Sequence, residues 1–127
     1  MRAATAASIA SVSDVEILSG PPRFTIDVIR RVVTTACRRV GAERALLFGS
    51  YARGDADAYS DVDLLIVCPT QRRFLDRHEL FADVMGAFPS CDLPVYSPGE
   101  LDELRERGVV YEALREGIVL YPETEAP

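Results

Sequence analysis

The chain has 127 residues, of which 48% are apolar, 14 are basic and 20 are acidic, so its net charge is −6. This length fits one domain with a single core, and the apolar share argues against a disordered chain. The acidic balance argues against direct nucleic-acid binding, which usually needs a basic surface. The 14 basic residues are all arginine, and the absence of lysine excludes a Walker A phosphate loop.

Nothing in the sequence indicates a membrane or secreted protein. No stretch reaches the roughly 20 apolar residues that span a membrane, and the N-terminus MRAATAASIASVSD is too polar for a secretory signal. Cys37, Cys68 and Cys91 lie among apolar residues without the spacing of metal ligands, which favours buried side chains in a reducing environment. We therefore predict a cytoplasmic protein that makes no membrane contact.

One domain is expected over residues 21–122, between a flexible N-terminal extension (1–20) and a mobile tail (123–127). Hydrophobic spacing, glycines and prolines predict the secondary structure. The expected helices span 25–40, 73–88, 98–107 and 109–115, and the expected strands span 44–48, 61–68, 91–96 and 117–121. This order predicts an α/β (α+β) fold, a mixed sheet of about four strands backed by helices. The strand at 91–96 contains a proline, so it should lie at a sheet edge or a bulge.

The stretch GSYARGDADAYSDVDLLIV, from Gly49 to Val67, concentrates the polar residues that indicate function. Asp61 and Asp63 open the second strand, and the alternation of side chains puts both on the same face. Two neighbouring carboxylates repel each other, and a divalent cation can bridge them. Oxygen-only ligation suits Mg²⁺, which binds through one or two carboxylates plus substrate phosphates. Taken alone, the pair also fits a solvated acidic turn at the start of a strand.

Gly49 and Ser50 directly follow the first predicted strand. A glycine lets the backbone approach a ligand closely, and the residues from Ser50 to Arg53 can begin a helix whose free N–H groups face a phosphate. Ser50 adds a hydroxyl and Arg53 adds a cation, although Arg53 can equally bridge to Asp55 or Asp57. A Gly-Ser pair after a strand is by itself most often a simple turn. A phosphate-binding turn at one strand end beside an acidic pair at the next strand start is the combination that indicates nucleotide chemistry.

Gly49-Ser50, ten intervening residues and then Asp61-Val62-Asp63 resemble the signature of the nucleotidyltransferase superfamily that includes DNA polymerase beta. The longer string is similar to the minimal nucleotidyltransferase (MNT) domain, and in particular to MNT antitoxins encoded beside HEPN-domain toxins. The specific match covers about nineteen residues, and the order of elements extends it more weakly over residues 25–121. The resemblance implies the nucleotidyltransferase fold.

Roles for single residues follow from this resemblance. Gly49 and Ser50 would hold the β and γ phosphates of ATP, with Arg53 as a further candidate for phosphate binding. Asp61 and Asp63 would bind two Mg²⁺ ions. Two metal ions can stabilise both the attacking and the leaving oxygen of an in-line displacement, so the implied chemistry is physically consistent with an acidic site.

Other polar residues are assigned with alternatives. The family has a third carboxylate on a neighbouring strand, and Asp92 in CDLPVY is the candidate that would ligate the catalytic metal and help deprotonate the acceptor hydroxyl. Asp83 is a rival by sequence distance, but it falls within a predicted helix opposite its apolar face. Tyr59 can stack on a nucleotide base or be an exposed turn residue. His78 shares a helix face with phenylalanines, which favours packing or partner contact over catalysis.

Within these 127 residues we expect no second domain that could bind an acceptor. In the resembled group the acceptor is the HEPN toxin, an RNase, and AMP is added to one of its tyrosines. The resemblance therefore implies an ATP- and Mg²⁺-dependent protein adenylyltransferase that acts as an antitoxin. Two alternatives stay open: a non-catalytic antitoxin that masks its toxin by binding, and a nucleotidyltransferase that acts on the hydroxyl of a small molecule.

Overall fold

The computed structural model of the protein describes residues 20–123. The expected N-terminal extension (1–20) and C-terminal tail (123–127) therefore lie outside the described residues, apart from their innermost positions. The helices are α2 (Ile26–Val40), α3 (Ser50–Arg53), the 3₁₀ helix η1 (Phe74–Phe81), α4 (Ala82–Ala87), α5 (Pro98–Leu104) and α6 (Gly108–Glu116). The strands are β2 (Arg44–Phe48), β3 (Val62–Val67), β4 (Cys91–Asp92), β5 (Val95–Tyr96) and β6 (Ile118–Tyr121).

The strands form one mixed sheet in the order β4-β3-β2-β6, with β5 also paired to β3. β2 is antiparallel to both β3 and β6, whereas β4 and β5 run parallel to β3. The sheet has five strands instead of about four because the expected strand 91–96 is interrupted at Leu93 and Pro94. Proline has no N–H to donate, so it belongs at an edge, and the Pro94 carbonyl accepts a 3.0 Å hydrogen bond from Ile66 N. The predicted edge position of this segment is confirmed.

The first predicted helix is confirmed, and the sequence explains both of its ends. The Thr25 side chain caps the N-terminus of α2 by accepting a 3.1 Å hydrogen bond from Val28 N. Gly41 ends the helix in the left-handed conformation, with φ 89°. None of the helices within residues 20–123 has the length and apolar character needed to cross a membrane.

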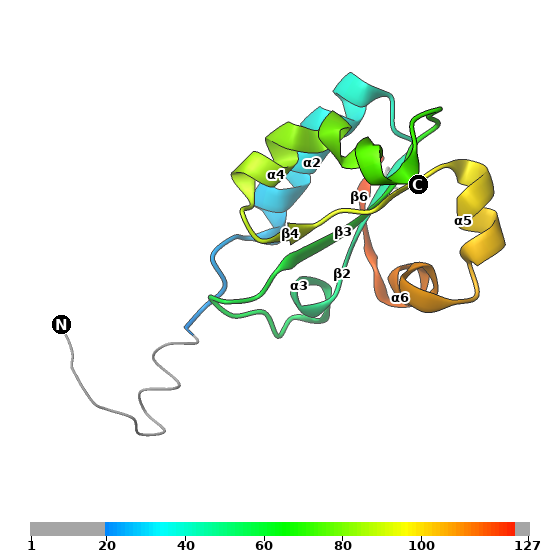
Figure 1. Ribbon diagram of the computed structural model, residues 1–127. Coiled ribbons are helices and arrows are strands. Elements are labelled where there is room, and N and C mark those ends of the chain that lie inside the picture. The colour runs from blue at the N-terminus through cyan, green and yellow to red at the C-terminus, as the bar shows by residue number, and fades with distance from the viewer. Residues whose placement is uncertain (1–19, 124–127) are drawn as a thin grey trace.

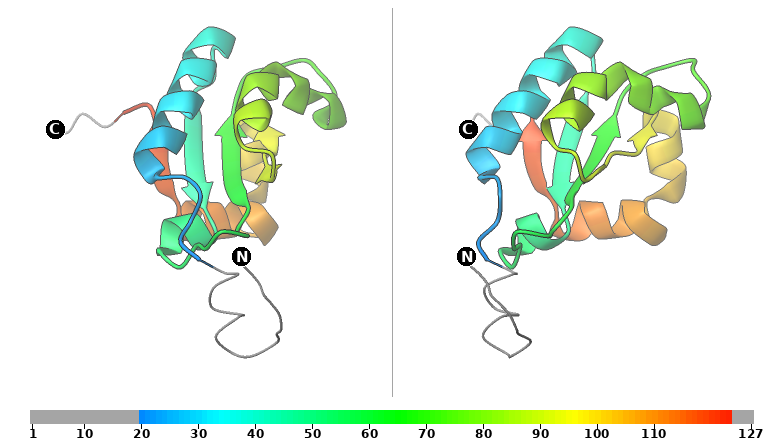
Figure 2. Two further views of the ribbon diagram at one scale, coloured as in Figure 1. Left: turned by 90° about the vertical axis from the view of Figure 1, so that its left-hand side faces the viewer. Right: turned by 60° about the vertical axis from the view of Figure 1, so that its left-hand side comes forward.

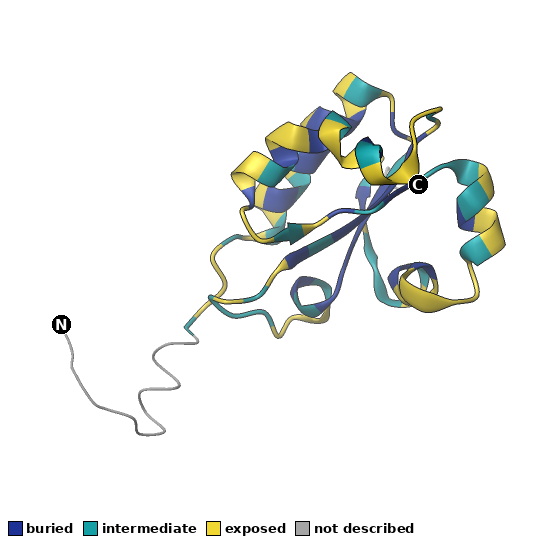
Figure 3. Cartoon of the chain, in the orientation of Figure 1, coloured by how far each residue is buried: buried dark blue, intermediate teal, exposed yellow. Residues whose placement is uncertain are grey.

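Helices cover both faces of the sheet (Figures 1 and 2). On one face, α2 and α4 lie side by side and bury the larger core, which includes Ile29, Leu47 and Leu64. On the other face, α5 and α6 bury a smaller cluster that includes Leu65 and Leu101. Burial is concentrated on the central strands β2 and β3, as the dark ribbon in Figure 3 shows. Because β2 is packed on both of its faces, the position of its C-terminal end is fixed.

The segment expected to be helical over residues 73–88 is helical, but it is divided into two helices. The structure has the 3₁₀ helix η1 followed by the short α4. A 3₁₀ helix has three residues per turn, so Phe74, Arg77 and Leu80 share one face. The Phe74 ring contacts Tyr96 at a centroid distance of 5.3 Å, Arg77 is buried against β5, and Leu80 packs against the larger core. These tertiary contacts at a spacing of three override the α-helical preference of the segment.

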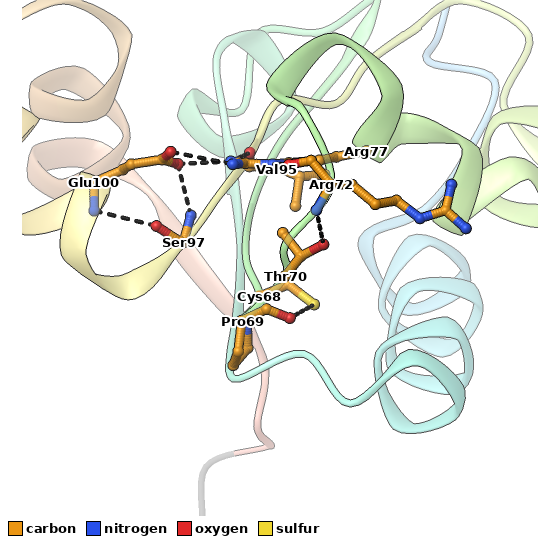
Figure 4. A network of polar contacts seen from close by, with 8 residues as sticks. All are labelled: Cys68, Pro69, Thr70, Arg72, Arg77, Val95, Ser97 and Glu100. Atoms are coloured by element: carbon orange, nitrogen blue, oxygen red, sulfur yellow. Dashed lines mark hydrogen bonds and ion pairs between the residues drawn. The ribbon is translucent and has the colours of Figure 1, made fainter.

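Arg77 is the most deeply buried charged side chain among the described residues, with 6% exposure, and it ties three elements together (Figure 4). Its guanidinium donates to the carbonyl oxygens of Arg72 at 2.9 Å and of Val95 at 3.0 Å. It also forms a bidentate pair with Glu100, with distances of 2.6 and 3.1 Å. Glu100 completes a capping box with Ser97 at the start of α5. The pair therefore joins η1, the edge strand β5 and α5.

Glu100→Gln should lower the stability of the protein in a way that depends on pH. Its hydrogen bonds with Arg77 and Ser97 hold the pKa of Glu100 at about 2, below the usual 4.5. A carboxyl with a lowered pKa in the folded state stabilises the protein above its unfolded pKa, and that contribution is lost as the pH falls from 4.5 towards 2. We expect a loss of about 1–2 kcal/mol at pH 7, because hydrogen bonds to charged groups contribute about that much when partly exposed.

Urea unfolding at several pH values measures this effect. The variant should lose stability less steeply than the wild type between pH 4.5 and 2. Glu103→Gln, on an exposed position of the same helix, is the matched control. Equal stability of Glu100→Gln and the wild type at pH 7 would contradict the role given to the pair.

Candidate active site

The fold places Asp63 on the same face of the sheet as α5 and α6. Val62 and Leu64 point into the larger core, so Asp63 between them must face the opposite side, together with Leu65. Its register partner across β2, Phe48, belongs to the α5–α6 cluster. Asp63 is half-buried at this end of the sheet.

Asp92 lies beside Asp63 in the sheet. The two residues are register partners of the parallel strands β3 and β4, and such partners point to the same face. Asp61 immediately precedes β3 and accepts a hydrogen bond from the Ser90 hydroxyl, which precedes β4. The structure therefore brings Asp61, Asp63 and Asp92 to the beginnings of two adjacent strands, although these residues are up to 31 positions apart in the chain.

The three carboxylates interact unfavourably. The pKa of Asp63 is raised from 3.8 to about 6, mainly by burial and also by the charges of Asp92, Asp61 and Glu116, whereas Arg53 lowers it. An oxygen-only donor set of this kind suits Mg²⁺, whose remaining ligands are usually waters and substrate phosphates. Within residues 20–123, no three His, Cys, Asp or Glu side chains are already grouped as a metal cage. The donor type of these carboxylates, and not a preformed set of three ligands, is what suits Mg²⁺.

Gly49 forms the turn between β2 and α3, and its backbone requires glycine. Its φ of 75° and ψ of −154° lie in a region that other residues essentially do not adopt. A Cβ atom at this position would lie 2.1 Å from Asp63 Oδ2, so the glycine is what lets the turn pass directly over the carboxylate. The short α3 begins at the next residue, Ser50, as expected, and the Ser50 hydroxyl forms no hydrogen bond with any described residue.

Glu116, at the end of α6, is a part of this site that the sequence did not predict. Its Oε2 atom accepts hydrogen bonds from Gly49 N at 3.2 Å and from Arg53 Nη1 at 3.5 Å. Arg53 Nε also lies 3.6 Å from Asp55 Oδ2. The expected ion pair with Asp55 is therefore present, together with one to Glu116. No local pattern marks Glu116, because it ends a helix 63 positions after Arg53 and meets it only through the pairing of β2 with β6.

The other candidates lie outside the carboxylate cluster. Asp83 forms a 2.8 Å ion pair with Arg39 of α2, on the side of the larger core, so it is not the third carboxylate beside Asp63. Tyr59 is 69% exposed in a turn, which agrees with its interpretation as an exposed turn residue. His78 is exposed on η1, not packed within the core. Of the cysteines, Cys37 and Cys68 are buried as expected and Cys91 is half-buried, and all three are free thiols.

Residues 29–120 match the family described as "Nucleotidyltransferase domain". This match covers more than half of the chain, so the protein belongs to the nucleotidyltransferase domain family. The resemblance noted in the sequence is thereby confirmed at the level of the family. The mixed sheet with helices on both faces is the expected nucleotidyltransferase fold.

The chain is also similar to three individual proteins. A solved structure provisionally described as a minimal nucleotidyltransferase shares 30% identity, with a TM-score of 0.52, over 76% of this chain and 96% of that one. A crystal structure described as a toxin–antitoxin with AMP-PNP shares 21% identity, with a TM-score of 0.52, over 72% of each chain, and supports the fold alone. A protein of Methanocaldococcus jannaschii, provisionally described as a protein adenylyltransferase, is 50% identical over 44 residues, which are 34% of this chain and 30% of that relative's length.

Gly49→Ala should destabilise the protein more than a glycine substitution at a comparable turn. The new Cβ would meet the Asp63 carboxylate in addition to the backbone strain, which by itself costs about 1–3 kcal/mol. Gly54→Ala is the matched control, because Gly54 has a φ of 87° and nothing within 4 Å of a Cβ. Thermal unfolding by circular dichroism compares the two variants. A Gly49→Ala variant as stable as Gly54→Ala would show that the turn does not need to pass so close to Asp63.

Proposed function

We propose that the protein is an ATP- and Mg²⁺-dependent protein adenylyltransferase that transfers AMP to a tyrosine of a HEPN-domain toxin and thereby acts as its antitoxin. The observation that carries this proposal is the position of the Gly49 turn directly over Asp63, with Asp61 and Asp92 beside it. A turn suited to phosphates and an acidic cluster suited to a metal are thus in contact in one small region.

The residues divide the work of binding between them. Gly49 and Ser50 would hold the terminal phosphates of ATP, the role that the resemblance to the superfamily implies for them. Arg53 is 51% exposed and remains accessible to a phosphate despite its contacts with Asp55 and Glu116. The carboxylates of Asp61, Asp63 and Asp92 would hold Mg²⁺. When bound, Mg²⁺ supplies charge neutralisation at the phosphates, without which three acids would repel a triphosphate.

The transfer itself is a substitution at the α-phosphorus of ATP. The acceptor oxygen forms a bond to the α-phosphorus, the bond from that phosphorus to the bridging oxygen breaks, and pyrophosphate leaves with the bonding electron pair. The acceptor hydroxyl gives its proton to a base, for which Asp92 is the candidate. Positioning and charge stabilisation contribute most of the acceleration in such reactions, and both are what this cluster can provide.

The toxin–antitoxin context rests on resemblance and on one neighbour. The resemblance in the Gly49–Val67 stretch is to MNT antitoxins, and a similarly folded solved structure is described as a toxin–antitoxin with AMP-PNP. The fragmentary match to an archaeal protein provisionally described as a protein adenylyltransferase supports AMP as the transferred group. Masking of the toxin without catalysis is the alternative that the experiment must exclude, and it leaves the strained Gly49 turn and the acidic cluster without a purpose.

The double variant Asp61→Asn with Asp63→Asn separates catalysis from masking. It keeps the side-chain shapes but removes two charges, so Mg²⁺-dependent ATP binding should be lost. AMP transfer should fall by about 10³-fold or more, since charge stabilisation by a metal contributes several kcal/mol. The fold should be at least as stable as the wild type, because repulsion around Asp63 is relieved. Calorimetry with ATP and Mg²⁺, and intact-mass spectrometry of the co-expressed HEPN protein, measure these effects.

Growth of cells that co-express the HEPN protein completes the comparison. The double variant should still associate with the toxin yet fail to give lasting protection. Asp83→Asn, which removes a carboxylate outside the cluster, is the control and should protect like the wild type. Full protection by the double variant, with no AMP adduct on toxin taken from the wild-type culture, would establish masking instead.

Removal of the Glu116 carboxylate should weaken ATP binding through Arg53. Glu116→Ala frees Arg53 and the Gly49 N–H from their shared acceptor, so both should be less well positioned for phosphate. We expect the dissociation constant of ATP with Mg²⁺ to rise by about tenfold or less, because exposed ion pairs contribute at most about 1 kcal/mol. Glu116→Gln should recover part of the loss, since its amide oxygen can still accept from Gly49 N.

A double-mutant cycle shows whether Glu116 acts through Arg53. If it does, Arg53→Ala and the double variant Arg53→Ala with Glu116→Ala should bind ATP with similar affinity. Glu112→Ala, at an exposed position of the same helix, controls for a general change in charge. Fully additive effects of the two substitutions would contradict the positioning role.

A further inference from the structure

A groove of ≈ 480 Å³ lies at the edge of the sheet and begins at Asp92. It runs along β4 and β5, and η1, α4 and α6 supply its walls. Most of its lining is apolar and comes from Phe74, Leu75, Met85, Tyr96 and Val109. Its size corresponds to the lower part of the range of about 300–1,000 Å³ that is typical of ligand sites.

The order of the strands decides which reactant meets this groove. Gly49 follows β2, Asp63 lies on β3 and Asp92 lies on β4, so the three positions follow one another across the sheet. In the proposed function, the phosphates of the departing pyrophosphate are held at Gly49. Attacking and leaving oxygens lie roughly in line in this class of reaction, so the acceptor must approach from the opposite side. That side is the β4 edge, where the groove opens.

The chemistry of the groove limits what kind of acceptor fits. Phe74, Leu75 and Val109 are 44%, 77% and 37% exposed, which is unusual for neighbouring large apolar side chains. Exposed apolar patches of this kind mark contacts with other proteins. The lining holds no arginine, its one histidine is His78 and its one carboxylate is Asp92, so it lacks the basic surface that a nucleic acid needs. A polar, cationic amino sugar would gain little from the apolar walls.

We propose that this groove receives a peptide segment of the acceptor protein, bound through its apolar side chains, so that a hydroxyl within the segment reaches Asp92. The inference rests on the proposed function, because it places the acceptor opposite the pyrophosphate. It goes further in assigning a surface and a chemical class: an apolar peptide carrying a hydroxyl. Continuity between the groove and the candidate active site at Asp92 is what distinguishes it from an ordinary apolar patch.

Leu75→Asp tests the groove without disturbing the fold, because Leu75 is 77% exposed. Val28→Asp is the matched control: Val28 is 36% exposed and lies on α2, away from the groove. The probes are two blocked pentapeptides with a central tyrosine, one flanked by leucine and phenylalanine and one by serine and glutamine, together with kanamycin. Labelled ATP with Mg²⁺ reports AMP transfer, calorimetry reports ATP binding, and amide NMR spectra locate the bound peptide.

The apolar peptide should accept AMP faster than the polar peptide and kanamycin. Its NMR shifts should centre on Leu75, Tyr96 and Val109. Leu75→Asp should reduce its labelling by about tenfold or more, since the contact of one leucine contributes about that factor, and should leave ATP affinity unchanged. Val28→Asp should match the wild type in every measurement.

Three results would overturn the inference: no peptide-induced shifts in the groove at millimolar concentration, equal or faster labelling of the polar probes, or unchanged labelling of Leu75→Asp. Failure of the proposed function looks different. In that case the wild type would not bind ATP with Mg²⁺, whereas the NMR titration without nucleotide would still decide whether the groove binds the apolar peptide.

Discussion

The repulsion among Asp61, Asp63 and Asp92 is the constraint on which the arrangement of this protein depends. The carboxylates are held together because β3 is fixed by burial on both of its faces. Val62 and Leu64 fill the larger core, and a register shift of one residue would turn Asp63 into that core and expose the apolar side chains. The hydrophobic pattern of β3 therefore sets the position of the acids, and the core supplies the free energy that offsets their repulsion.

Each side of the acidic cluster is anchored by a different polar contact. On the β2 side, Glu116 accepts from Gly49 N and Arg53, which fixes the turn above Asp63 from the end of α6. On the β4 side, Arg77 joins η1, β5 and α5 through Glu100, so the edge segment that carries Asp92 is attached to two further elements. Ion pairs, whether buried like Arg77–Glu100 or partly exposed like Arg53–Glu116, are weak sources of stability, but they can fix one arrangement among several. Both contacts join residues far apart in the sequence at the borders of one site.

The sequence predicted those parts of the structure that depend on local rules. Thr25 and Gly41 bound α2 as cap residues do, and the alternation of β3 correctly placed Asp63 on one face with its neighbours in the core. The expected helix over 73–88 is divided into η1 and α4, because Phe74 and Arg77 make contacts with β5 that no local pattern records. Glu116 was missed for the same reason: it reaches Gly49 only after β6 has paired with β2.

The acidic cluster does not stabilise the fold. Asp63 is half-buried with a raised pKa, and its one favourable charged neighbour, Arg53, is shared with Asp55 and Glu116. Asparagine would fill the same space without the repulsion. Gly49 adds a second destabilising feature. Its backbone conformation excludes other residues, and it brings the turn against the carboxylate of Asp63. Two destabilising features that meet at one point, on an otherwise well-packed sheet, are what is expected where a protein gives up stability for chemistry. A bound Mg²⁺ would neutralise the repulsion among these carboxylates and would offer a positive charge to a phosphate at the Gly49 turn.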